Sequence, residues 1–165
     1  LGIDPGYAIV GYGVIEFKSN RFSVVDYGAI TTNAGTPFER RLELIYDDLN
    51  LLMGKFHPEA MSIEKLFYNT NAKTVIDVAQ ARGVTVLAAK KNNIPIFEYT
   101  PLQVKQSVVG YGRAEKKTVQ EMTRIILKLA KIPKPDDTAD ALAMAICHAH
   151  ASGSLMGKLN SMGIR

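Results

Sequence analysis

Three apolar runs separated by turns occupy the first 31 residues. The runs LGID, IVGYGVIEF and RFSVVDYGAITT are rich in β-branched and aromatic residues, which favour strands. The turn signals PG and KSN separate them. This pattern predicts three strands that follow one another as an antiparallel meander.

From residue 36 to residue 55 the apolar positions recur every three or four residues, as in an amphipathic helix. Pro37 suits the first turn of that helix. The rest of the pattern predicts strands near 60–66 and 94–99, a long helix at 72–91, and helices at 100–109, 114–130 and 137–151. This order predicts an α/β domain with a mixed five-stranded sheet, a three-strand antiparallel meander plus two parallel strands, flanked by helices.

The chain has 165 residues, enough for one domain with a substantial core. We expect that domain at residues 1–151, followed by a flexible C-terminal tail at 152–165 that shows no clear pattern. No apolar run approaches the roughly 18 residues of a membrane span, and no signal peptide is visible. The single cysteine, Cys147, excludes an intramolecular disulfide and suits a reducing cytoplasm. The net charge of +4 and the pI near 9.1 favour a polyanionic partner.

Two acidic residues stand where apolar strands are predicted. Asp4 ends the first run, just before Pro5 and Gly6, and Glu64 lies in AMSIEKLF. A carboxylate buried in an apolar strand must be paired, hydrogen-bonded or bound to a metal, because burying it alone is very unfavourable. The alternative interpretation of Asp4 is an ordinary turn-forming aspartate. A purely structural interpretation is weakest for Glu64, since glutamate is disfavoured in an apolar strand.

A third acidic group opens the last predicted helix. Asp137 and Asp140 in DDTAD are three residues apart and project from one helix face. Asp136 and Asp137 are also suitable N-cap residues, which is the simpler interpretation of either one alone. If all these segments converge, the carboxylates repel one another unless a cation is present, and hard Mg²⁺ or Mn²⁺ ions prefer carboxylate oxygen. Two such ions are suited to hydrolysing a phosphodiester.

Several longer motifs resemble one known family. GIDPG, IEKLFYNTNAKT, QARGV, FEYTPLQVKQSVVGYGRAEKKTVQ and DDTADALAMAICH resemble, in order, the RuvC crossover (Holliday) junction endodeoxyribonucleases of bacteria. The resemblance covers about residues 1–150. It implies an RNase H-like fold and a homodimer that resolves four-way DNA junctions by paired symmetric nicks in recombination and repair. It also implies Mg²⁺, with two ions per site and Mn²⁺ as a substitute, a branch-migration motor complex as partner, and a cytoplasmic location.

The resemblance assigns the catalytic and metal-binding roles residue by residue. It implies that Asp4, Glu64, Asp137 and Asp140 are the catalytic acids and metal ligands. Asp137 is the one of the four at whose position some relatives carry histidine. Asp136 falls outside this set and is interpreted as a cap or a helper.

Basic and aromatic residues lie near these acids in the predicted fold. Lys116 and Lys117 begin a helix, where their charge opposes the macrodipole unless a phosphate docks there, and the resemblance places Lys105 beside DNA as well. The predicted DNA contacts are Phe67, Tyr68, Lys105, Arg113, Lys116 and Lys117. The alternatives are a solvated charged turn for the basic residues and core anchors for the two aromatic residues, which otherwise stack on an unpaired base.

The helix around Val75–Leu87 is apolar round most of its circumference. Such a helix is buried on more than one side, and a second copy of the chain is a suitable cover, in a two-fold dimer with two equivalent sites. Three other functions remain as alternatives: an RNA-processing nuclease of the same fold, an actin-like ATPase, and a non-catalytic junction binder. A single chain of this length is too short for the two lobes of an actin-like ATPase, and the four acids argue against a mere binder.

Overall fold

The computed structural model describes residues 1–65 and 72–161 of the chain. Its sheet contains β1 (Gly2–Asp4), β2 (Ile9–Lys18), β3 (Arg21–Thr31), β4 (Met61–Glu64) and β5 (Ile96–Tyr99). The strand order is β3-β2-β1-β4-β5. β1, β2 and β3 pair antiparallel, whereas β4 and β5 run parallel to β1. The predicted mixed sheet, a meander plus two parallel strands, is confirmed.

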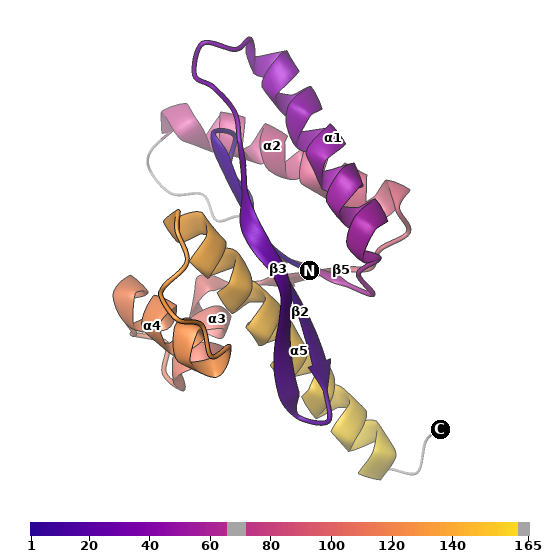
Figure 1. Ribbon diagram of the computed structural model, residues 1–165, viewed down its shortest axis with the longest axis vertical. Coiled ribbons are helices and arrows are strands. Elements are labelled where there is room, and N and C mark those ends of the chain that lie inside the picture. The colour runs from indigo at the N-terminus through magenta and orange to yellow at the C-terminus, as the bar shows by residue number, and fades with distance from the viewer. Residues whose placement is uncertain (66–71, 162–165) are drawn as a thin grey trace.

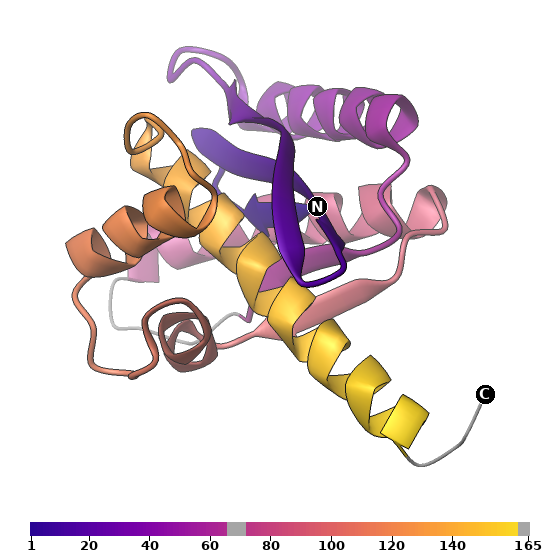
Figure 2. The ribbon, with the colours of Figure 1, turned by 60° about the horizontal axis from the view of Figure 1, so that its bottom comes forward.

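Helices cover both faces of the sheet (Figures 1 and 2). α1 (Phe38–Phe56) and α2 (Ala72–Lys91) pack together on one face. α3 (Pro101–Val109), α4 (Lys116–Ile126) and α5 (Asp136–Ser161) pack together on the other, and α5 crosses β1 and β2. The result is a three-layer α/β domain with the sheet in the middle.

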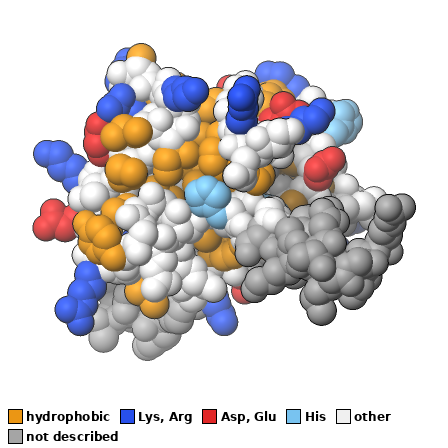
Figure 3. All heavy atoms as spheres, turned by 90° about the horizontal axis from the view of Figure 1, so that it is seen from below, with side chains coloured by type: hydrophobic (Ala, Val, Ile, Leu, Met, Phe, Trp, Pro, Cys, Tyr) orange, Lys and Arg blue, Asp and Glu red, His pale blue; other side chains and the backbone are white. Residues whose placement is uncertain are grey.

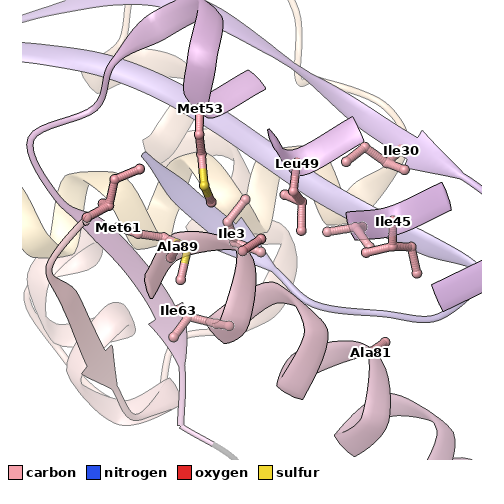
Figure 4. Packing of buried hydrophobic residues seen from close by; sticks show 12 residues of the cluster. Ile3, Ile30, Ile45, Leu49, Met53, Met61, Ile63, Ala81 and Ala89 are labelled. Carbon is pink, nitrogen blue, oxygen red and sulfur yellow. The ribbon is translucent and has the colours of Figure 1, made fainter. Parts of the chain in front are cut away.

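The core between the sheet and α1–α2 is made of large aliphatic side chains (Figure 4). Ile3 and Ile63 from the central strands meet Ile45, Leu49 and Met53 from α1, all of them almost fully buried. Each such side chain contributes about 1.5–3 kcal/mol by leaving water. This core holds β1 and β4 rigidly side by side, and both strands end at an acid.

The opposite face of the sheet lets α5 come much closer. Gly2, Gly11 and Gly13 lie beneath α5, and a Cβ atom added at Gly11 would be only 2.0 Å from the carbonyl oxygen of Asp137. A side chain at that position is excluded by the helix backbone. The glycines therefore let the first turns of α5 rest directly on β1 and β2.

Two helix boundaries differ from the sequence prediction. α4 ends at Ile126, not at residue 130, because Lys128 adopts a left-handed φ of 54°, which stops a helix. α5 continues past residue 151 to Ser161, so the predicted end was wrong. The long β2–β3 hairpin extends beneath this part of α5, where Phe17 and Phe22 contact His150. The division into a domain at 1–151 and a flexible tail at 152–165 stays a prediction.

The surface away from the start of α5 has a mixed character. Seen from below, hydrophobic side chains gather near the middle of this face, and Lys and Arg lie mostly toward its edges (Figure 3). Within the residues that the structure describes, no helix is both long enough and apolar enough to cross a membrane.

Candidate active site

Asp4 and Glu64 lie at the ends of two neighbouring parallel strands. The register pairs Gly2 with Ser62 and Ile3 with Ile63, so the next residues along, Asp4 and Glu64, stand side by side at one end of the sheet. Both side chains are partly exposed, while the residues just before them are fully buried. The two central strands β1 and β4 thus each end in a carboxylate, at the same end of the sheet.

The start of α5 brings the remaining acids to the same end. Asp4 pairs across the strands with Gly11, and Gly11 lies directly under the backbone of Asp137. Asp140 is one turn further along α5, and it lines a cavity of about 180 Å³ together with Glu64. The convergence predicted for these four acids is therefore present in the structure, although their catalytic role is not tested by it.

Burial and neighbouring negative charge raise the pKa values of three acids in this cluster. Burial, and then the charges of Asp140, Asp137 and Glu64 in that order, together raise the pKa of Asp4 to about 7. The pKa of Glu64 is also raised, by burial and then by Asp140. Burial likewise raises the pKa of Asp140, in spite of a nearby lysine. Such a group of acids attracts a cation.

Lys116 supplies one positive charge to the cluster. Its Nζ lies 2.8 Å from Oδ2 of Asp140 and 3.9 Å from Oδ2 of Asp136. The hydrogen bond to Asp140 raises the pKa of Lys116. Lys116 and Lys105 line the same cavity as Glu64 and Asp140, whereas Arg113 and Lys117 are exposed nearby in the chain. Sequence reasoning placed Lys116 against DNA phosphate and missed this ion pair.

Arg82 is a second residue that sequence reasoning missed. It forms an ion pair with Glu98 on β5, and its Nε donates a hydrogen bond to the backbone carbonyl of Glu64, at 3.2 Å. It therefore fixes the end of β4 to the end of β5. The available signal was a charged residue on an otherwise apolar helix, since Arg82 and Asp77 are the charged residues between 75 and 89.

Asp136 pairs with a basic residue, and two of the predicted DNA contacts lie outside the part of the chain that the structure describes. Asp136 is bonded to Lys134, with 2.5 Å between Nζ and Oδ1, which fits its interpretation as a residue outside the catalytic set. Phe67 and Tyr68 lie outside the described residues. Their proposed contact with DNA bases stays a prediction.

The donor set suits a hard divalent cation. No three acidic, histidine or cysteine side chains in the described part of the chain form a ready-made metal cage. The carboxylates of Asp4, Glu64 and Asp140 nevertheless share one end of the sheet, and the charge of Asp140 raises the pKa of both Asp4 and Glu64. Carboxylate oxygens are the ligands that Mg²⁺ and Mn²⁺ prefer, so these residues would hold such an ion.

Comparison with known proteins identifies the family. The family model described as crossover junction endodeoxyribonuclease RuvC matches residues 1–148. The chain belongs to the RuvC family. The crossover junction endodeoxyribonuclease RuvC of Ruminiclostridium cellulolyticum is 61% identical over 159 residues, which span 95% of this chain and 96% of that protein. Family membership confirms that the chain is a nuclease, as its motifs predicted.

Solved RuvC structures share the fold. The structure of Thermus thermophilus RuvC has a TM-score of 0.85 and 32% identity, covering 93% of this chain and 94% of that one. The same protein in complex with a Holliday junction substrate has a TM-score of 0.86 and 33% identity, with 92% of each chain covered. The RNase H-like fold expected from the sequence is thereby confirmed for this RuvC-family chain.

Proposed function

We propose that this RuvC-family nuclease resolves four-way DNA junctions by Mg²⁺-dependent hydrolysis of one phosphodiester in each of two opposing strands. The observation that carries the proposal is the convergence of Asp4, Glu64, Asp137 and Asp140 at one end of the sheet. The similar Thermus thermophilus protein in complex with a Holliday junction substrate supports the choice of DNA. Recombination and DNA repair are the processes in which such junctions arise.

At the scissile phosphate the acids and the lysines have different proposed roles. The four acids would hold one or two divalent ions, and these ions would supply a more acidic water molecule and neutralise charge at the reacting phosphate. Asp4 is fixed by the rigid β1 strand, and its raised pKa supports a role for a bound cation, which would favour the ionised carboxylate at neutral pH. Lys116 and Lys105 line the adjoining cavity, and their ammonium groups would hold the DNA backbone in place.

The proposed dimer forms through α2. Ile76 and Leu87 are 65% and 50% exposed although both are large and apolar, and Ala79 and Gly83 lie on the same exposed stripe. We define Ile76, Ala79, Gly83 and Leu87 as the α2 stripe. A two-fold partner covering this stripe places two equivalent sites against two equivalent strands. We also propose a branch-migration motor complex as partner and a bacterial cytoplasmic location.

A cleavage assay tests the proposal. The protein is incubated with a synthetic four-way junction or with a linear duplex of the same sequence, in Mg²⁺ or in EDTA. We expect paired nicks in the junction alone and in Mg²⁺ alone. Equal cutting of the linear duplex, or cutting in EDTA, would contradict the proposal.

A further inference from the structure

The first turn of α5 is attached to the sheet by two contacts that touch none of the reacting atoms. Thr138 is fully buried between two of the proposed metal ligands, Asp137 and Asp140. Its Oγ1 donates a hydrogen bond to the backbone carbonyl of Gly28 on β3, at 3.0 Å. This bond joins residues 110 positions apart in the sequence.

The second contact lies on the neighbouring strand. A Cβ atom at Gly11 would be 2.0 Å from the Asp137 carbonyl oxygen and 2.9 Å from the Thr138 nitrogen. Gly11 pairs with Asp4 on one side and with Ala29 on the other. Asp4, Gly11 and Ala29 are therefore paired side by side across β1, β2 and β3. The first turn of α5 lies directly on the middle residue of this set, Gly11.

These contacts bear on the separation of the acids. Asp4 belongs to the sheet and Asp137 and Asp140 belong to the helix, so any shift of the helix changes the distances between their carboxylates. The backbone of α5 lies directly against β2, with no flexible side chain between them that could adjust to such a shift. The position of α5 along and above β2 thus decides whether the acids share an ion.

We propose that Thr138 and Gly11 are positioning residues, which hold the first turn of α5 at the distance from β1 that lets the acids bind a divalent cation together. This inference rests on the proposed function of the acids. It assigns no catalytic role to either residue, and it predicts that metal affinity depends on a hydroxyl that no metal touches.

The test measures metal binding without DNA, as the rise in the unfolding midpoint on titration with Mg²⁺ or Mn²⁺. Thr138→Val keeps the side-chain shape and removes the hydroxyl. We expect it to raise the metal concentration for half-maximal stabilisation about tenfold, as is typical when a residue supporting a metal ligand is removed. Thr138→Ser restores the hydroxyl and should restore the wild-type metal dependence.

Thr85→Val is the matched control. Thr85 is also fully buried, and its Oγ1 donates to the Ala81 carbonyl at 2.9 Å, within α2 on the far face of the sheet. We expect this variant to lose stability in EDTA but to keep the wild-type metal dependence. If Thr138→Val and Thr85→Val respond to metal alike, the inference is overturned.

Two further samples separate this inference from the proposed function. Asp4→Asn shows how much of the metal response belongs to the acid site. A wild-type response no larger than that of Asp4→Asn would overturn the metal site and the positioning residues with it. A normal wild-type response that Thr138→Val leaves unchanged overturns the positioning residues alone. Gly11→Ala should weaken metal binding further, and if it does not fold, the Thr138 variants still decide.

Discussion

α2 and α5 are the two long alanine-containing helices of the domain, and they lie on opposite faces of the sheet. The part of α5 from Ala139 to Cys147 is almost entirely buried, between the sheet and the helices α3 and α4. Between residues 75 and 91 of α2, where burial is described, the buried residues are Ala81, Thr85, Ala88 and Ala89. Its opposite side exposes Ile76 and Leu87.

The two helices have similar compositions but different surroundings. In α5 the small residues allow a close approach to the glycines of β1 and β2, which brings Asp137 and Asp140 to Asp4. In α2 the same kind of composition leaves an apolar stripe exposed among the described residues, and such a stripe is typical of an interface. We therefore assign chemistry to the α5 face and assembly to the α2 face.

The largest effect is expected from the acids on the α5 face. Asp4→Asn, Glu64→Gln and Asp140→Asn should each reduce Mg²⁺-dependent nicking by about a thousandfold or more, because charge stabilisation at the reacting phosphate dominates such catalysis. Junction binding should survive. Asp137→Asn should be less damaging. The exposed Asp47 on α1 provides the control, since Asp47→Asn should cut normally. Near-normal nicking by any of the first three variants would remove that residue from the site.

The next effect concerns the α2 stripe. Leu87→Asp places two like charges against each other across the two-fold axis, and burying them should cost several kcal/mol, enough to separate a moderate dimer. Sedimentation gives the mass. Leu51→Asp is the matched control, because Leu51 is a leucine on α1 that is even more exposed than Leu87, 71% accessible against 50%. A Leu87→Asp protein that remains dimeric would place the interface elsewhere and end the division of roles between the two helices.

A smaller effect links the acid cluster to stability. The pKa of Asp4 is about 7 in the folded chain and 3.8 in its ordinary state, so the folded state binds the extra proton between these values. Without metal, stability should therefore fall as the pH rises from about 4 to about 7 and stay low above it. Asp4→Asn should then be more stable than wild type at pH 8 in EDTA, by up to a few kcal/mol, with no difference near pH 4. Urea unfolding at both pH values measures this, and equal stabilities at pH 8 would contradict it.

The smallest effect concerns DNA affinity. Lys105→Ala, Lys116→Ala and Lys117→Ala should each weaken junction binding and reduce the slope of log K against log salt by roughly one unit. Lys90→Ala, at the end of α2, should change neither. An unchanged slope for the first three variants would assign those lysines to bulk solvent, and a changed slope for Lys90→Ala would extend the DNA surface to the α2 face.

The local features of the fold could be predicted from the sequence. The acids Asp4 and Glu64 were recognisable because ionisable residues are disfavoured in apolar strands, and the spacing of Asp137 and Asp140 placed them on one helix face. The strands and most of the helices follow from local periodicity, which needs no knowledge of the tertiary structure. The end of α5 was missed because Gly153 and Ser154 are poor helix formers, whereas the β2–β3 hairpin beneath that region supports the helix.

The contacts between distant segments could not be predicted in this way. The bond from Thr138 to Gly28, the ion pair of Lys116 with Asp140 and the bond from Arg82 to Glu64 each join residues from different elements. Nothing local to Thr138 distinguishes it from an ordinary helix residue. Likewise, Gly11 resembles any strand glycine until the path of α5 above it is known.

The order in which the acids occur along the chain has a consequence for synthesis. Asp4 and Glu64 leave the ribosome early, but the residues from Asp136 onward, which cover the glycines of β1 and β2, come last. Domains fold as units while the chain is made, so a nascent chain that lacks α5 carries only half of the acid cluster. With the roles proposed for these acids, we expect a nascent chain to become competent to cut DNA only after α5 has docked on β1 and β2.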